Sequence, residues 1–514
     1  MDATGLPWAA QCAGMAFSAF SLCLVALAAV LLLVRRWPWC SCHVCRAYLT
    51  GSWARDFTNL GDWYAHLLRE SPTGTVHIHV LGCTVTANPA NVEYMLKTNF
   101  DNFPKGKTFA ALLGDLLGGG IFNVDGHAWR HQRKMASLEL GSVAVRSYAY
   151  KIIAQEIEAR LMPVLAGAAD AGAVLDLQDV FRRFAFDTIC KISFGLDPGC
   201  LEREMPMSKL ADAFDAATRL CAMRGAAASP LLWRMKRLLN VGSERELKKA
   251  IKLVDELAAA MIRERRKLGV AGSHDLLSRF MASAGDGDAD AAVHDDKYLR
   301  DIVVSFLLAG RDTVSSALTT LFMLLSKNPD VAAAMRAEAG GGGDGSSPAV
   351  STYEHLKSLH YTHAVLYENM RMFPPVQFDS KFCAAADVLP DGTYVPGGAR
   401  VMYHPYAMGR MPRIWGTDNG VFRPDRWLTG AGGSFVPESL YKYPVFQAGL
   451  RVCLGKELAI TEMKAVAVAV VRAFDVEVVG ESGSGACAPK FVSGLTASIS
   501  GGLPVRITRR VRNN

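Results

Sequence analysis

The sequence feature that most constrains the fold is a long apolar helical pattern at residues 297–327. The dipeptide Asn328-Pro329 is a helix stop signal, and at 1.5 Å per residue the 31 positions before it span about 45 Å, the width of a whole domain. The centre of the pattern, VVSFLLAG, is almost wholly apolar. Such a helix is expected to run through the core of a large domain rather than over its surface.

The middle of this predicted helix breaks the rules that hold for its ends. Residues Ala309–Thr313 read AGRDT. A glycine in a helix interior costs ~1 kcal/mol relative to alanine, and Asp312 and Thr313 need polar partners if they are buried. Such violations indicate a functional site, and the alternative is a kink that one buried water solvates.

Composition excludes several classes of protein. The 514 residues are 50% hydrophobic and 20% charged, which is too apolar for a disordered chain and too large for a small stapled scaffold. The net charge of +7 is spread along the chain without a dense basic footprint, so we expect no nucleic-acid partner. A mean hydropathy of +0.14 is too low for a polytopic membrane protein, so any membrane segment should be local.

One uncharged run near the N-terminus is long enough to cross a membrane. It covers Ala13–Val34 and ends on Arg35, Arg36 and Trp37, a flank that keeps the following chain on the cytoplasmic side. We predict a short lumenal N-terminus at 1–12, a transmembrane signal-anchor helix at 13–34, a juxtamembrane linker at 35–60 and one globular domain at 61–514. The alternative is a cleavable secretory signal, whose apolar part is shorter.

Helical patterns dominate the rest of the chain. Glu244–Leu268 has apolar residues at helical spacing, whereas strand patterns occur only at Thr75–Thr86, Lys381–Met402 and Phe474–Val479. This indicates a mostly α fold with small β-sheets, of the α+β class. Gly340–Gly345 has the spacing of a dinucleotide-binding loop, but no strand precedes it and no helix starts on it, so any nicotinamide or flavin must be bound by a partner.

A cluster of potential metal ligands follows the apolar run. Cys40, Cys42, His43 and Cys45 are residue types that bind zinc. All four lie within six residues, whereas structural zinc sites usually join ligand pairs from separated segments. The spacing therefore favours free juxtamembrane thiols, which acylation could modify, over a zinc site.

Cys453 has a different setting from the other cysteines. It lies in Phe446–Gly455, FQAGLRVCLG, directly before a helical pattern. Backbone N–H groups at the start of that helix are expected to hold the sulfur as a thiolate, and Gly449 and Gly455 allow the backbone to approach a flat group closely. A metal-bound thiolate is therefore the favoured interpretation of Cys453.

The pattern F-x-x-G-x-R-x-C-x-G resembles the haem-binding loop of the cytochrome P-450 superfamily. Three further motifs resemble that family in order and spacing: AGRDT on the long helix, E-x-x-R at Glu368 and Arg371, and FRPDRW at Phe422–Trp427. The resemblance implies the fold of that family and a haem whose iron has Cys453 as axial ligand. It further implies haem-binding roles for Phe446, Gly449, Arg451, Gly455, Trp129 and Arg133, the charged members of which would reach the propionates.

The resemblance also implies a reaction and its residues. A partner NADPH–cytochrome P-450 reductase would supply two electrons, and one oxygen atom of O₂ would enter a substrate C–H bond. Asp312 and Thr313 would deliver protons, and Gly310 would leave room for O₂. Glu368, Arg371 and Arg426 would form a structural triad beneath the haem, although Glu368 and Arg371 alone would resemble an ordinary surface salt bridge.

Finer similarity is to the plant fatty-acid ω-hydroxylase branch, some members of which oxidise jasmonoyl-isoleucine. It is carried by segments such as GIFNVDG and YHPYAMGRM. It implies an endoplasmic reticulum membrane protein with its catalytic domain in the cytosol and a lipid substrate. Lys105 or Lys107 is a candidate partner for the substrate carboxylate, though either also fits a solvated lysine. The candidate lining of the substrate pocket is Phe103, Phe306, Ala309, Val314 and Val376.

Three positions depart from the usual family pattern: Val314, Asp425 and Leu450. Two alternatives to a monooxygenase stay open at this point. One is an isomerase or dehydratase of the same fold that acts on an oxygenated lipid without a reductase. The other is a haem-binding membrane protein without catalysis.

Overall fold

The computed structural model describes Leu24, Cys40 and residues 42–202, 209–227, 229–269, 274–283, 295–340, 350–430, 433–480, 489–492 and 494–510. The predicted membrane anchor at Ala13–Val34 therefore lies, apart from Leu24, outside the described residues. Most of the two predicted loops at 284–296 and 339–348 lies outside them as well.

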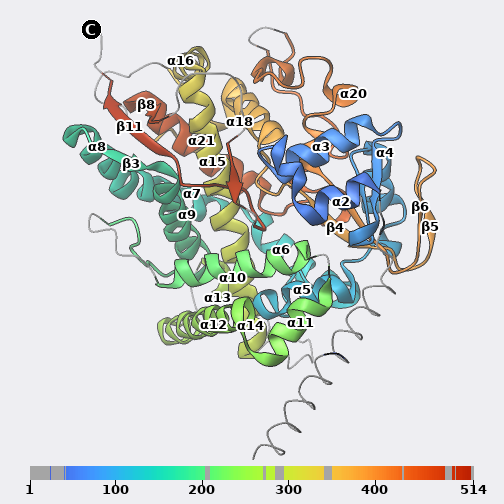
Figure 1. The fold of residues 1–514 in the computed structure, drawn as a ribbon. Coiled ribbons are helices and arrows are strands. Elements are labelled where there is room, and N and C mark those ends of the chain that lie inside the picture. Colours follow the sequence, from blue (N-terminus) through green and yellow to red (C-terminus); the bar gives the residue numbers. More distant parts are fainter. Residues whose placement is uncertain are drawn as a thin grey trace, which may run out of the picture.

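The described chain is mostly helical with small sheets, as the sequence predicted (Figure 1). The α-helices are α2 (His43–Thr50), α3 (Leu60–Glu70), α4 (Pro89–Glu93), α5 (Gly106–Leu117), α6 (Gly126–Gly141), α7 (Val143–Glu156), α8 (Met162–Ala171), α9 (Leu177–Phe194), α10 (Lys209–Ala226), α11 (Pro230–Leu239), α12 (Gly242–Leu268), α13 (Leu276–Ser283), α14 (Asp296–Leu307), α15 (Thr313–Lys327), α16 (Pro329–Glu338), α17 (Tyr353–Ser358), α18 (His360–Met372), α19 (Pro405–Met408), α20 (Pro412–Trp415) and α21 (Lys456–Ala473).

The strands are β1 (Thr75–Ile78), β2 (Cys83–Thr86), β3 (Val174–Asp176), β4 (Asp379–Phe382), β5 (Asp387–Val388), β6 (Tyr394–Val395), β7 (Arg400–Tyr403), β8 (Phe474–Val478), β9 (Phe491–Val492), β10 (Ser498–Ile499) and β11 (Pro504–Arg509). Short 3-10 or π turns named below are η2 (His79–Leu81), η3 (Tyr94–Thr98), η7 (Leu308–Asp312), η8 (Pro424–Trp427), η9 (Pro444–Phe446) and η10 (Gly449–Arg451).

The predicted core helix is present as α14, η7 and α15, which together run from Asp296 to Lys327. It passes through the middle of the molecule, where α15 packs against α9, α18 and α21 (Figure 1). Among the described residues it is the one helix long and apolar enough to cross a membrane, but 67% of its most apolar window is buried inside the protein. Its apolar residues therefore pack in the core of the protein.

The predicted N-terminal strands pair with later ones. The sheet has the order β1-β2-β7-β4, in which β1 and β4 run antiparallel to their neighbours and β2 lies parallel to β7. Helix α2 packs on this region through the buried residues Cys45 and Ala47. Residues 43–50 are thus part of the packed body, although the sequence analysis placed them in a linker.

A second sheet, β3-β11-β8, joins the C-terminus to the segment before α9. The sequence predicted β8 but missed β11. In β11 the residues Val505 and Ile507 are buried and alternate with exposed neighbours, which is the pattern of a strand with one face on the core.

Candidate active site

The candidate active site is built around the loop that carries Cys453. The backbone N–H of Cys453 donates to the carbonyl of Phe446 at 2.8 Å, which closes the loop before α21. Gly449 has a φ of 60°, and a Cβ there would lie 1.9 Å from the carbonyl oxygen of Leu96, so only glycine fits against η3. A Cβ on Gly455 would meet nothing within 4 Å, so the space beside this residue is open.

The sulfur of Cys453 experiences opposing effects. Surrounding protein raises the pKa of the thiol by desolvation, whereas the N–H of Gly455 and the charge of Arg133 favour the thiolate. The start of α21 therefore favours the thiolate, as the sequence predicts, while desolvation opposes it, and the thiolate itself stays a prediction. The side chain keeps an exposed surface, and a coordinated metal ion would remove its proton outright.

The Cys453 loop lies against the central helix. Leu454 packs in a small apolar cluster with Ile302 and Phe306 of α14. These two residues precede Ala309 by about two turns and one turn of helix. The cysteine and the AGRDT segment, 140 residues apart in the sequence, thus belong to neighbouring parts of the structure.

The AGRDT segment interrupts the central helix with a π turn, η7, which confirms the predicted irregularity. The hydroxyl of Thr313 donates to the carbonyl of Ala309 at 2.6 Å, and Ala309 is exposed although the flanking helix is mostly buried. A Cβ on Gly310 would lie 2.4 Å from Cδ1 of Ile189. The structure therefore shows a packing reason for Gly310, the close approach of α9, and room for O₂ beside this residue stays a prediction.

Asp312 belongs to a buried charged group. The guanidinium of Arg311 pairs with Asp312 at 3.1 Å and with Asp215 of α10. Burial raises the pKa of Asp312 to about 6, against the opposing effect of Arg311. Asp312 also lines a polar pocket of about 500 Å³ with Asp215 and Ser315, so its proton lies close to solvent-accessible space.

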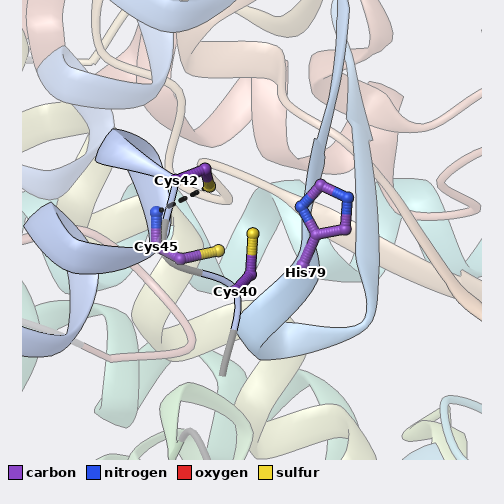
Figure 2. A group of neighbouring side chains, drawn as sticks. All are labelled: Cys40, Cys42, Cys45 and His79. Carbon is purple, nitrogen blue, oxygen red and sulfur yellow. Dashed lines mark hydrogen bonds between the residues drawn. The ribbon is translucent and has the colours of Figure 1, made fainter. Parts of the chain in front are cut away.

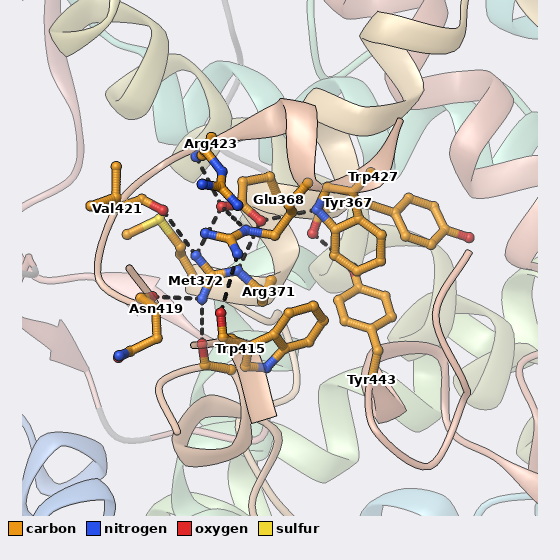
Figure 3. Close-up of polar contacts among 12 residues, drawn as sticks. Tyr367, Glu368, Arg371, Met372, Trp415, Asn419, Val421, Arg423, Trp427 and Tyr443 are labelled. Carbon is orange, nitrogen blue, oxygen red and sulfur yellow. Dashed lines mark hydrogen bonds and ion pairs between the residues drawn. The ribbon is translucent and has the colours of Figure 1, made fainter. Parts of the chain in front are cut away.

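The structure brings Glu368, Arg371 and Arg426 together. Figure 3 shows Glu368 and Arg371 with Trp427 beside them. The carboxylate of Glu368 accepts from Nε of Arg371 at 2.8 Å, from Nε of Arg426 at 2.9 Å and from the indole N–H of Trp427 at 2.9 Å. The side chains of Glu368 and Arg371 are 0% exposed. They form a buried network, so the comparison with a surface salt bridge is wrong.

Arg371 joins separate segments of the chain, and the two arginines keep Glu368 ionised. Arg371 donates to the carbonyls of Asn419 and Val421 at 2.7 and 3.1 Å, which ties α18 to the segment before η8. Burial tends to raise the pKa of Glu368, but the hydrogen bonds and charges of Arg371 and Arg426 hold it below its usual value. The carboxylate therefore stays ionised inside the core.

The other predicted cofactor-binding residues lie beside the Cys453 loop. Arg451 donates to Asp125 at 2.6 Å, and its guanidinium lies 4.5 Å from the ring centroid of Trp129. Arg133 donates to the carbonyl of Val452. Helix α6 thus supports the loop through Trp129 and Arg133, and contact of these residues with haem stays a prediction.

The sequence analysis missed a buried charged cluster next to Arg451. Asp379 pairs with Lys105 at 2.5 Å and with Lys381 at 3.3 Å, and it accepts from the hydroxyl of Tyr403 at 3.0 Å. Lys105 is therefore committed to Asp379 and is neither a solvated lysine nor free for a substrate carboxylate. Lys381 is 0% exposed. A lysine inside a strand pattern was the feature of the sequence that could have indicated this buried charge.

This cluster fits the carboxylate groups of a haem. Nε of Arg451 is buried without a hydrogen-bond partner, and Nζ of Lys381 is buried with Asp379 at 3.3 Å as its counter-charge. Burial lowers the pKa of Lys381 to about 7, and the charges of Lys105 and Arg451 act in the same direction. Because an unpaired buried donor is costly, a propionate there would accept from Nε of Arg451, and it would add a second acceptor beside Lys381.

The predicted substrate-pocket residues separate into two groups. Ala309 is exposed, and Phe306 and Val376 are half-buried, which suits a lining role. Phe103 and Val314 are 1% and 3% exposed and pack in two hydrophobic cores, so the prediction that they line the pocket is wrong. The other two departures from the family pattern, Asp425 and Leu450, are exposed.

We predict that Glu368→Gln destabilises the protein by about 3–5 kcal/mol, because it leaves two buried arginines without their counter-charge. Haem per chain and the midpoint of thermal unfolding measure the effect. Since the pKa of Glu368 is held low, its contribution is complete at neutral pH and is lost as the pH falls below about 4.

The matched control is Glu354→Gln, which removes an exposed carboxylate 3.5 Å from Lys357. A change within about 0.5 kcal/mol is expected there. If Glu368→Gln keeps the native haem content and unfolding midpoint, the triad does not carry the stability assigned to it.

Comparison with known proteins places these features in one family. The family model described as Cytochrome P-450 matches residues 63–495. Cytochrome P-450 94C1 of Arabidopsis thaliana is 55% identical over 93% of this chain and 95% of its own length. Cytochrome P-450 94B3 of the same plant is 48% identical, over 89% and 90%. The chain therefore belongs to the cytochrome P-450 family, as a monooxygenase of the 94 branch with a thiolate-ligated haem and reductase-supplied electrons.

Proposed function

We propose that this monooxygenase hydroxylates the terminal (ω) carbon of a fatty acid or of a fatty-acid-derived conjugate such as jasmonoyl-isoleucine. The observation that supports this proposal most is the similarity to the 94 branch over almost the whole chain. Segments such as GIFNVDG and YHPYAMGRM also resemble those of plant fatty-acid ω-hydroxylases. Exposed Ala309 supports the proposal, because a small apolar side chain beside the reacting centre admits the end of an acyl chain.

Haem, when bound, supplies the activation of O₂, and the chain's own residues orient and protect that chemistry. Cys453 provides the ligand atom, and the neighbouring Gly455 leaves open space for a flat group. Arg451 and Lys381 would hold the propionates. The buried network of Glu368 fixes α18 and the segment up to Trp427, so these groups stay in place.

Asp312 and Thr313 are the proposed route for protons. Asp312 lines the polar pocket, and burial raises its pKa to about 6, so near neutral pH it both gains and loses a proton readily. Thr313 follows it in the chain and anchors its hydroxyl on the carbonyl of exposed Ala309. On this proposal, the π turn would hold the acid of Asp312 toward the polar pocket and the hydroxyl of Thr313 toward the reacting centre.

We further propose attachment to the endoplasmic reticulum membrane, with the catalytic domain in the cytosol. Helix α11 supports this, because it combines exposed apolar residues with Arg234, Lys236 and Arg237, as interfacial helices do. Its exposed apolar residues are Leu231, Leu232, Met235, Leu238 and Leu239. The hydroxyl of Tyr48 in α2 donates to the carbonyl of Ala226 at 2.7 Å. Ala226 is the last residue of α10, just before α11, so α11 begins close to α2, which the predicted anchor would precede.

The substrate proposal is tested with the full-length protein in microsomes that contain a cytochrome P-450 reductase and NADPH. The panel consists of saturated and unsaturated fatty acids from lauric to oleic acid together with jasmonoyl-isoleucine. We expect an NADPH-dependent product with its hydroxyl on the terminal carbon, located by mass spectrometry. If all acyl substrates stay unoxidised while the carbon-monoxide spectrum is normal, the proposal is wrong. Turnover of a lipid hydroperoxide without NADPH would favour an isomerase.

We predict that Asp312→Asn lowers kcat by about a hundredfold, the lower end of what proton transfer contributes. Because the carboxyl loses its proton as the pH rises through about 6, the native kcat should fall on that limb, and the limb should be absent in Asp312→Asn. Saturating turnover measured from about pH 5 to 9 tests both points.

Asp425→Asn serves as the control, since Asp425 is exposed on η8 and should change neither kcat nor its pH profile. A carbon-monoxide spectrum shows that each variant keeps its haem. An Asp312→Asn protein with the native kcat and the native pH profile would remove Asp312 from the proton route.

A further inference from the structure

Four side chains from two separated segments meet beside the sheet of the N-terminal region (Figure 2). Cys40, Cys42 and Cys45 come from the start of α2 and the residues before it, and His79 comes from η2, between β1 and β2. One potential ligand atom from each of the four lies within 4.8 Å of the others.

This grouping answers the objection to a metal site, which was that all the candidate ligands lie within six residues of the sequence. The sequence places His43 inside the cysteine cluster, but in the structure His43 is exposed on α2 and does not belong to the group. His79 takes its place from a hairpin more than thirty positions later in the sequence. The ligand set therefore has the separated origin that structural zinc sites usually show.

Hydrogen bonds already orient two of the sulfurs. The backbone N–H of Cys45 lies 3.4 Å from Sγ of Cys42, and the backbone N–H of Val80 lies 3.3 Å from Sγ of Cys45. Donors of this kind stabilise negative charge on sulfur. The second bond also joins α2 directly to η2, so the two ligand segments are held together by backbone contacts.

We propose that Cys40, Cys42, Cys45 and His79 bind one Zn²⁺ ion in a tetrahedral structural site. Zinc bonds of about 2.3 Å to sulfur and about 2.0 Å to nitrogen place tetrahedral ligand atoms about 3.5–3.8 Å apart, so shifts of about an ångström complete the site. On binding, each thiol releases its proton to solvent, and three thiolates with one neutral imidazole leave a net charge of −1.

The other uses of these thiols fit the geometry less well. Acylation needs a thiol that projects into lipid, whereas Cys45 is 0% exposed and its sulfur accepts from Val80. A disulfide would use two of the three sulfurs and leave the third beside His79 without a role. Four ligands suit zinc, which prefers four-coordinate sites of sulfur and nitrogen.

The site would fasten the start of α2 to the sheet. Residues 40–45 lead from the N-terminal segment into α2, and His79 lies on the β1–β2 hairpin. Because structural zinc contributes directly to folding, a bound zinc ion would hold the start of α2 against the β1–β2 hairpin.

The test uses the full-length, haem-loaded protein, purified without a histidine tag or a chelator. Zinc per haem is measured by elemental mass spectrometry, and X-ray absorption at the zinc edge reports the ligands. We expect about one zinc per haem, with three sulfurs at about 2.3 Å and one nitrogen at about 2.0 Å. The zinc edge is separate from that of iron, so haem does not interfere.

Cys40→Ser and His79→Asn are the informative variants, because neither residue is fully buried. Each should weaken zinc binding at least about a hundredfold, since even outer-shell changes cost about 10–100-fold. His43→Asn and His77→Asn are the matched controls and should keep the zinc. Carbon-monoxide spectra confirm that every variant is folded.

Three results would overturn the proposal. One is a native protein with less than about a tenth of a zinc per haem, against the full occupancy expected of a structural site. Another is zinc that persists in both ligand variants or is lost equally in His43→Asn. The third is a disulfide, or an acyl chain on Cys40 or Cys42, found by mass spectrometry of the intact protein.

Discussion

The buried carboxylate of Glu368 is the interaction on which the site depends. It accepts hydrogen bonds from Arg371, Arg426 and Trp427, and Arg371 reaches on to the carbonyls of Asn419 and Val421. The residue before it continues the connection, because the carbonyl of Tyr367 accepts from the hydroxyl of Tyr443 at 3.0 Å, directly before η9 and the Cys453 loop. One ionised group thus organises the backbone that leads into the Cys453 loop.

The central helix combines two requirements that oppose each other. Its apolar length forms the core between α9, α18 and α21, whereas its middle must carry an acid and a hydroxyl. The π turn at η7 resolves this conflict locally: Gly310 admits Ile189 of α9, and Arg311 compensates the buried charge of Asp312.

Local patterns in the sequence predicted the long elements, the motif residues and the family, because periodicity and spacing are local properties. Contacts between distant segments were not predictable in the same way. The pairing of Lys105 with Asp379, the core positions of Phe103 and Val314, and the approach of His79 to Cys40 each join residues far apart in the chain. Strand β11 was missed because its short alternating pattern is weak without its partner β8.

The central claim is that the sulfur of Cys453 is the ligand of the haem iron. The most direct test is the carbon-monoxide difference spectrum of the reduced full-length protein and of Cys453→Ser. The account predicts the band of a thiolate-ligated haem in the native protein and its loss in Cys453→Ser. A native protein without that band, or a Cys453→Ser protein that keeps it, would contradict the account.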